Sequence, residues 1–321
     1  MKVVRVLKVK IFLLSLICSS LIIPRAEAQT TAGYWLNIKS PQELKQFFQY
    51  SPDRIPFISA HRGGARKGFP ENCIATFENT LQYTPAIMEV DPRYTKDSVI
   101  VLMHDATLDR TTNGKGKVID YTWAELQKLR LKDTEGNVTS YKIPALDEAL
   151  EWAKGKTVLV LDKKDVPLAV RIKKINEHGA GASAMVMAYN YQEAKEGYKL
   201  DKNIMMEVFV PNQAKLAEFD KTGVPWANTV IFIAHAKPED KGLYQLLHQK
   251  GALCIIGSAR IYDKEFKTGK TGVYEEIIKE GADIIEADLA IEAGTGIKKL
   301  VPPRSSKEKF FTKSTTKKKS A

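Results

Sequence analysis

The sequence has few cysteines, which argues against a fold stabilised by a framework of disulfide bonds. Three cysteines occur in 321 residues, and Cys18 lies in an apolar stretch close to the first residue. Cys73 and Cys254 stand beside apolar runs on widely separated segments. One disulfide between them is chemically allowed outside the cytoplasm, but their spacing does not indicate that they meet. We therefore expect two buried thiols.

The central part of the chain also has a net charge close to zero. Of the formal net charge of +11, residues 1–28 contribute +4 and residues 302–321 contribute +6, which leaves +1 for residues 29–301. A nearly neutral body argues against a dedicated nucleic-acid-binding protein, because such a protein presents a basic face.

The sequence also shows no Ser/His/Asp or Cys/His nucleophile arrangement, and no feature predicts an obligate protein partner.

Residues 1–28 are typical of a secretory signal peptide. A basic head precedes an apolar core, Ile11–Ile23, that is too short for a comfortable membrane span, and Ala26-Glu27-Ala28 follows it. We expect cleavage after Ala28 and export to the periplasm or out of the cell. A lipid anchor at Cys18 is a less favoured alternative, since Ser15-Leu16-Ile17 is a poor match to a lipoprotein cleavage box.

Residues 302–321 predict a disordered, basic tail. Seven basic residues stand among serines and threonines, and Phe310-Phe311 is the single apolar pair. Such a composition lacks the apolar surface that a packed core requires. The tail could contact an anionic surface, but a solvated tail is favoured.

Short apolar runs alternate with helical patterns through the body, residues 29–301. We interpret eight of these runs as buried strands: Phe57–Ala60, Ile87–Val90, Thr157–Leu161, Ala184–Met187, Ile204–Phe209, Val230–Ala234, Leu253–Ile256 and Asp283–Ala287. Helices are predicted at 41–50, from Pro167, and at 190–200, 211–221, 238–250 and 274–280. Eight strands alternating with helices predict an α/β fold, and their number suits a closed (β/α)₈ TIM barrel. An open doubly wound sheet is the alternative, although no G-x-G-x-x-G turn follows the first strand.

One interval breaks this alternation, between the second and third predicted strands. It contains a strand-like stretch at Ser98–Met103, an Asn113-Gly114 turn signal and a helical pattern near Thr122–Leu129. The ordinary barrel pattern resumes at Pro144. We therefore interpret residues 93–143 as an insertion at the mouth of the barrel.

Acidic residues end two neighbouring strands of the predicted barrel. Glu89 and Asp91 are two residues apart, so both carboxylates lie on one face of a strand. Asp162 ends the next strand. Like charges in one pocket are costly unless a cation lies between them, and carboxylate oxygens suit a hard ion such as Mg²⁺ or Ca²⁺. The pattern predicts a divalent metal site at the carboxyl ends of these strands.

Histidines and cations accompany the acidic residues. His61 and Arg62 follow the first strand, His104 follows the strand-like stretch of the insertion, and Lys164 is two residues after Asp162. Cations beside a metal ion neutralise phosphate oxygens, and two imidazoles can deprotonate an attacking oxygen and protonate a leaving oxygen. The constellation therefore indicates phosphoryl chemistry. His235 fits a rim position without a catalytic role, whereas His178 and His248 fit structural positions near helix ends.

The quoted residues resemble a known family at several points. The matching motifs are His61-Arg62-Gly63-Gly64, Pro70-Glu71-Asn72, Glu89-x-Asp91 and His104-Asp105-x-x-Leu108-x-Arg110-Thr111-Thr112. Together they resemble the glycerophosphodiester phosphodiesterase family. Members of that family are TIM barrels with a small insertion after the second strand, and they use Ca²⁺ or Mg²⁺ to hydrolyse glycerophosphodiesters to sn-glycerol 3-phosphate and an alcohol.

The resemblance implies a role for each matching residue. His61 and His104 would be the acid/base pair. Glu89 and Asp91 would bind the metal, and Arg62 and Lys164 would hold the phosphate of a small-molecule substrate. Asp162 would be the third metal ligand at a position where the family usually has glutamate.

The carboxyl-terminal third departs from the family pattern and leaves the alcohol part of the substrate open. The stretches at the predicted mouth read Gly257-Ser258-Ala259-Arg260 and Glu286-Ala287-Asp288-Leu289. Two alternatives therefore stand beside hydrolysis of glycerophosphodiesters. One is a phospholipase D-like or phosphoinositide-cleaving enzyme that releases a cyclic phosphate, and the other is an inactive barrel that only binds a phosphorylated ligand.

Overall fold

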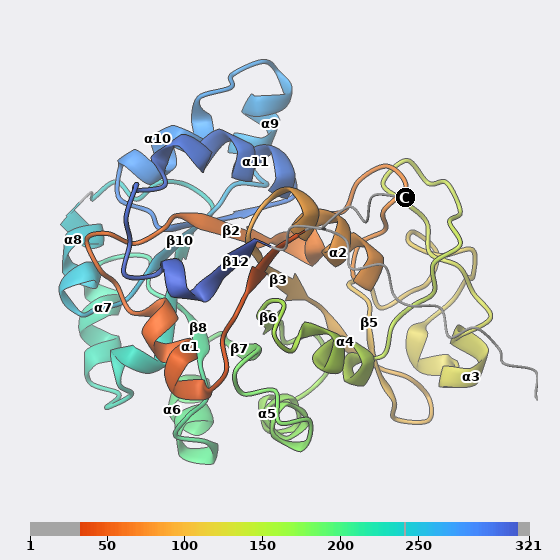
Figure 1. Cartoon of the computed structure of the whole chain (residues 1–321). Coiled ribbons are helices and arrows are strands. Elements are labelled where there is room, and N and C mark those ends of the chain that lie inside the picture. Colours follow the sequence, from red (N-terminus) through yellow and green to blue (C-terminus); the bar gives the residue numbers. More distant parts are fainter. Residues whose placement is uncertain (1–32, 241, 314–321) are drawn as a thin grey trace, which may run out of the picture. The chain divides into compact units, whose positions relative to one another are not determined.

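Eight parallel strands close into a barrel in the part of the chain that the computed structural model describes, residues 33–240 and 242–313 (Figure 1). In order around the barrel, they are β2 (Phe57–Ala60), β3 (Ala86–Val90), β6 (Leu159–Leu161), β7 (Ala184–Ala188), β8 (Met206–Phe209), β9 (Thr229–Ala234), β10 (Cys254–Gly257) and β11 (Ile284–Ala287). The last strand, β11, pairs in parallel with the first, β2, so the sheet has no free edge. The predicted (β/α)₈ barrel is confirmed, and the open-sheet alternative is wrong.

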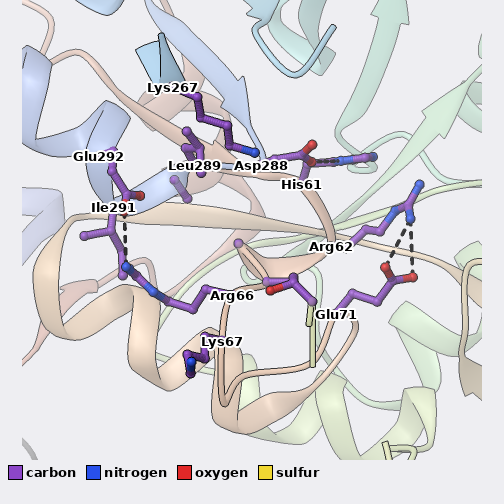
Figure 2. Close-up of a pocket in the computed structure, with 14 residues that line it drawn as sticks. His61, Arg62, Arg66, Lys67, Glu71, Lys267, Asp288, Leu289, Ile291 and Glu292 are labelled. Atoms are coloured by element: carbon purple, nitrogen blue, oxygen red, sulfur yellow. Dashed lines mark hydrogen bonds and ion pairs between the residues drawn. The ribbon is translucent and has the colours of Figure 1, made fainter. Parts of the chain in front are cut away.

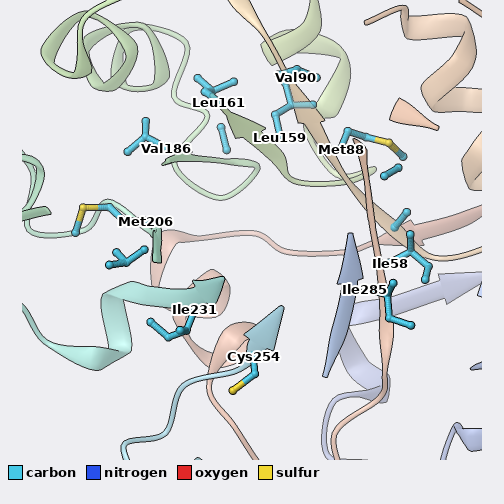
Figure 3. Packing of buried hydrophobic residues seen from close by; sticks show 14 of the residues in the cluster. Ile58, Met88, Val90, Leu159, Leu161, Val186, Met206, Ile231, Cys254 and Ile285 are labelled. Atoms are coloured by element: carbon cyan, nitrogen blue, oxygen red, sulfur yellow. The ribbon is translucent and has the colours of Figure 1, made fainter. Parts of the chain in front are cut away.

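Both faces of the barrel strands are apolar over most of their length, as expected for strands covered by helices on one side and filled on the other. Figure 3 shows outward-facing side chains such as Ile58, Met88 and Leu159, which belong to the large core cluster shared with the helices. Inward-facing Phe57 and Ile87 belong to a second core cluster, which fills the barrel and extends to the segments that cover its amino-terminal end. Toward the carboxyl ends, the inward positions change from apolar to charged residues, which places the site at the mouth.

Eleven α-helices are described in residues 33–240 and 242–313. They are α1 (Pro41–Phe48), α2 (Ile74–Tyr83), α3 (Trp123–Leu126), α4 (Leu146–Ala153), α5 (Leu168–Glu177), α6 (Tyr191–Leu200), α7 (Gln213–Asp220), α8 (Gly242–Gln249), α9 (Tyr262–Lys267), α10 (Val273–Lys279) and α11 (Ala290–Ile297). Asn190 caps α6, where its side-chain oxygen accepts from the Glu193 amide at 2.9 Å. Within the described residues, no helix is long and apolar enough to cross a lipid bilayer.

Three helices, α2, α9 and α11, have no counterpart among the predicted ones. In α11, Gly294 and Gly296 lower the intrinsic helix propensity, so the sequence of this segment does not predict a helix. The structure shows why Gly294 is there, because a Cβ atom at this position would lie 2.1 Å from Thr84 Oγ1. Close packing of α11 against the end of α2 therefore overrides the local preference.

A small antiparallel hairpin follows β3, formed by β4 (Pro92–Tyr94) and β5 (Ile100–Leu102). It continues into the 3₁₀ turn η2 (Val118–Asp120) and α3. This insertion has a core cluster of its own that includes Val101, Leu108 and Leu126 as well as Cys73. Cys73 and Cys254 are both free and buried, as the sequence indicated.

The amino-terminal end of the barrel is covered by α1 and by a two-stranded sheet of β1 (Tyr34–Leu36) and β12 (Phe311–Lys313). The prediction of a disordered tail is wrong for residues 302–313, because Phe310 is buried and its ring lies 5.7 Å from that of Phe47. Lys307 also donates to the carbonyl oxygen of Gln49 at 2.6 Å. The predicted signal peptide and residues 314–321 of the predicted tail lie outside the described residues.

Candidate active site

A sharp turn after β2 presents His61 and Arg62 at the mouth of the barrel. Arg62, Gly63 and Gly64 have φ values of 51°, 85° and 81°, which lie in the left-handed region. A Cβ atom on Gly63 would lie 2.2 Å from the Phe77 ring, so only glycine fits there. The turn directs the Arg62 backbone amide to Glu89, whose Oε2 atom accepts its hydrogen bond at 2.8 Å.

His61 is held between two acidic side chains, Glu89 and the Asp288 that Figure 2 shows beside it. Its Nδ1 atom lies 2.6 Å from Asp288 Oδ1, and its Nε2 atom lies 4.0 Å from Glu89 Oε2. Burial disfavours the charged imidazolium, but the hydrogen bond to Asp288 and the charges of Glu89 and Glu286 outweigh it and raise the His61 pKa to about 10. Because Asp288 holds Nδ1, the Nε2 atom is the one left to face a substrate.

The three predicted metal ligands converge at the carboxyl ends of β3 and β6. Glu89, Asp91 and Asp162 are buried, and each offers an oxygen within 4.8 Å of oxygens from the other two. Asn72 fixes Asp91 in place, because its side-chain amide donates to Asp91 Oδ2 at 2.6 Å and its carbonyl accepts from the Asp91 amide at 2.9 Å. Three buried carboxylates of this kind could hold a hard divalent ion.

Lys164 lies against the same acidic group. Its ammonium is 2.9 Å from Asp91 Oδ1 and also donates to Asp162. Burial and the neighbouring charge of Asp91 raise the pKa of Glu89 well above its usual range. For Asp162, burial acts in the same direction, but the hydrogen bonds from Lys164 and Tyr189 outweigh it and lower the pKa. Without a cation the cluster therefore favours a proton on Glu89, and a bound cation would instead stabilise the ionised carboxylate.

His104 lies on the insertion and is connected to the site through charged side chains. It follows β5, its Nδ1 atom lies 2.8 Å from Asp105 Oδ1, and Asp105 accepts from Arg110 at 2.7 Å and 2.9 Å. Arg110 donates to both oxygens of Glu71 at 2.8 Å. Glu71 in turn accepts from Arg62 at 3.3 Å, as Figure 2 shows. A continuous chain of charged groups thus connects the two histidine-bearing loops, although His104 does not itself contact His61 or the carboxylates.

Two hollows open at the carboxyl ends of the strands. The first has a volume of about 410 Å³ and is lined by His61, Arg62, Glu71, Lys267 and Asp288 among others (Figure 2). The second, of about 550 Å³, is largely apolar and is lined by Phe209, Phe232, His235 and Arg260 among others. His235 therefore lies at the rim, where the sequence placed it.

Several residues of the site had no role assigned from the sequence. Asp288 and Tyr189 contact predicted site residues across strands, whereas Glu71 belongs to a quoted motif without a predicted role. Glu207, on the inner face of β8, is fully buried, and neither of its carboxylate oxygens has a hydrogen-bond partner. A single acidic residue in the apolar run of β8 was a signal that could have marked it. Glu286 on β11, in a stretch that the sequence placed at the mouth, is buried as well, and burial raises its pKa to about 7.

Comparisons with known proteins agree with this geometry. A crystal structure of a glycerophosphoryl diester phosphodiesterase from Parabacteroides distasonis is 46% identical, has a TM-score of 0.85 and covers 88% of this chain and 99% of that one. Glycerophosphodiester phosphodiesterases of Caldanaerobacter subterraneus and Bacillus subtilis are 32% and 27% identical over 44% and 48% of this chain. The chain spans 62% and 59% of the length of these two curated relatives.

More than half of the chain matches one family. Residues 61–256, which begin at the first predicted catalytic histidine and end within β10, match the sequence model of one family. The match therefore covers the barrel strands that carry the three converging carboxylates as well as the insertion with His104. This chain belongs to the glycerophosphoryl diester phosphodiesterase family.

Proposed function

We propose that this protein hydrolyses glycerophosphodiesters to sn-glycerol 3-phosphate and an alcohol. The observation that carries the proposal is the convergence of Glu89, Asp91 and Asp162 within 4.8 Å beside the His61 turn. In our proposal these carboxylates hold Ca²⁺ or Mg²⁺, which would neutralise phosphate oxygens when bound. Membership of the family supports the assignment of the reaction.

Two cations of the site are suited to bind the phosphodiester. Lys164 already lies among the carboxylates, at 2.9 Å from Asp91, and the Arg62 guanidinium lies 3.8 Å from the same residue. Both side chains are mostly buried, at 17% and 20% exposure, so a charge-assisted hydrogen bond to a phosphate oxygen would be little screened by water. We assign them to orienting the substrate.

The histidines are suited to move the protons. His61 carries a proton near neutral pH because its pKa is raised to about 10, so we assign it to protonate the leaving oxygen from Nε2. His104 has Nδ1 engaged by Asp105, which likewise leaves Nε2 available, and we assign it to accept the proton of the attacking water.

The test is product analysis with the purified protein. Glycerophosphocholine or glycerophosphoethanolamine is incubated with and without Ca²⁺ or Mg²⁺, and products are identified by phosphorus NMR. Metal-dependent release of glycerol 3-phosphate supports the proposal, and full activity with no ion left by elemental analysis contradicts the metal assignment. Formation of a cyclic phosphate would indicate the phospholipase D-like reaction, and binding without turnover would indicate a binding barrel.

We further propose that the protein acts outside the cytoplasm. The proposal is supported by the basic head, apolar core and Ala26-Glu27-Ala28 site of residues 1–28. It is tested by fractionation of the producing cells and amino-terminal sequencing. A chain that begins at Gln29 in the exported fraction is expected, and an intact amino terminus in the cytoplasm would contradict it.

A further inference from the structure

The third predicted metal ligand, Asp162, is held by donors on both of its oxygens. Oδ1 accepts from the backbone amide of Lys163 at 2.6 Å and from the hydroxyl of Tyr189. Oδ2 accepts from the ammonium of Lys164 alone. Since a carboxylate oxygen has two acceptor positions, Oδ1 is fully used and Oδ2 keeps one open. The structure thus distinguishes the two oxygens of Asp162.

Tyr189 reaches Asp162 from the neighbouring strand. It directly follows β7, which pairs with β6, and its ring packs against Phe209 with the ring centroids 5.3 Å apart. Tyr189 is 47% exposed, so it forms part of the rim rather than of the core. The hydroxyl is the donor in this hydrogen bond, because a carboxylate oxygen can only accept.

We propose that Tyr189 is a positioning residue of the cation site, whose hydroxyl binds Asp162 Oδ1 and thereby directs Oδ2 toward Glu89 and Asp91. Aspartate is one methylene shorter than glutamate, so its carboxylate has less reach, and its orientation decides whether an oxygen can approach an ion held by the other two residues. The hydroxyl and the Lys163 amide together prevent rotation of the carboxylate. The inference rests on the proposed function insofar as these carboxylates bind a divalent ion.

The experiment separates the hydroxyl from the aromatic ring. Tyr189→Phe keeps the ring packed on Phe209 and removes the hydrogen bond to Asp162, together with a long contact of the hydroxyl with Met187 Sδ at 4.0 Å. Tyr191→Phe is a matched control, because Tyr191 lies two residues further on and donates to the Phe209 carbonyl at 3.1 Å, away from the carboxylates. Binding of Ca²⁺ and Mg²⁺ to the full chain is measured by calorimetry, with thermal unfolding in chelator as a check on the fold.

We expect Tyr189→Phe to weaken the affinity for the ion by about 10- to 100-fold, the usual effect of losing a residue that orients a metal ligand. Activity at limiting ion should fall accordingly and recover when the ion concentration is raised, whereas Tyr191→Phe should behave like the wild type. In an Asp162→Ala background, Tyr189→Phe should have no further effect on affinity, because its acceptor is gone.

The outcomes distinguish failure of the inference from failure of the proposed function. Equal affinities for the wild type and Tyr189→Phe would overturn the positioning role while leaving the metal site intact. No binding of either ion by the wild-type chain would overturn both. An equal loss of affinity in the Tyr191→Phe control would assign the effect to the loop rather than to the hydroxyl, and would also overturn the inference.

Discussion

Replacement of Asp288 by asparagine should lower the pKa of His61 and shift the pH dependence of the reaction. Asp288 Oδ1 lies 2.6 Å from His61 Nδ1, and the substitution removes the charge while keeping the shape. A hydrogen bond to a charged group contributes about 1.5–3 kcal/mol, and one pKa unit corresponds to about 1.4 kcal/mol. Because the Asp288 side chain is 53% exposed, solvent weakens the interaction, and we expect the low end of this range.

The expected His61 pKa is therefore roughly one unit lower than about 10. The sign follows from the role of the imidazole. If protonated His61 is the general acid, activity falls as pH rises through its pKa, so the alkaline limb of the pH–rate profile should move to lower pH in Asp288→Asn. At a pH below the alkaline limbs of both profiles, the variant should lose less activity than at a pH on the limb.

The assay combines a titration with kinetics. NMR of the imidazole C–H resonances in chelator gives the pKa of His61 directly, and initial rates across pH give the position of the alkaline limb. Glu292→Gln is the control, because Glu292 lies nearby on α11 but pairs with Arg66 at 3.1 Å and does not contact His61. An unchanged His61 titration in Asp288→Asn would refute the role that we assign to this carboxylate.

Three further predictions follow from the same contacts. Asp162→Ala should weaken metal affinity markedly in calorimetry, Asp162→Asn should be intermediate, and Asp162→Glu should retain activity; unchanged affinity in the alanine variant would remove Asp162 from the site. His61→Ala and His104→Ala should each lower kcat by at least about a hundredfold with the fold intact, and wild-type turnover in either would exclude that residue. Burial and neighbouring acids raise the pKa of Glu207, so the folded chain keeps a proton that the unfolded chain releases, and stability falls as pH rises above about 4.5. Glu207→Gln should therefore raise the unfolding midpoint in chelator at pH 8 by at least about 2 °C, and by less at pH 5; an equal effect at both pH values would contradict this.

The sequence was sufficient to predict the barrel because its strands are short apolar runs separated by helices, and each of the eight runs lies on a barrel strand. It was also sufficient to group Glu89, Asp91 and Asp162, since the carboxyl ends of neighbouring parallel strands meet at one mouth. Both inferences need only the positions of apolar runs along the sequence and of the acidic residues that end them.

Contacts between distant segments were not predictable in this way. Asp288 and His61 are 227 positions apart, and Tyr189 and Asp162 are 27 apart. Each pair follows two adjacent strands, so the barrel predicts that the residues lie near one another, but it does not predict which side chains form a hydrogen bond. The composition of residues 302–313 indicated disorder because it is polar, yet the burial of Phe310 against α1 is sufficient to order it. Packing between distant segments determines these contacts and the order of residues 302–313, and local sequence patterns do not report on such packing.

The pairing of β1 with β12 has a practical consequence for handling this protein. Tyr34 lies opposite Lys313 in register, so the described chain enters and leaves its barrel at one place. This place is the end that α1 and Phe310 cover, opposite the mouth that holds His61. A tether joined at either strand would leave the mouth facing away from the support, and a short linker joining the two strands would permit circular permutation with new ends in a surface loop.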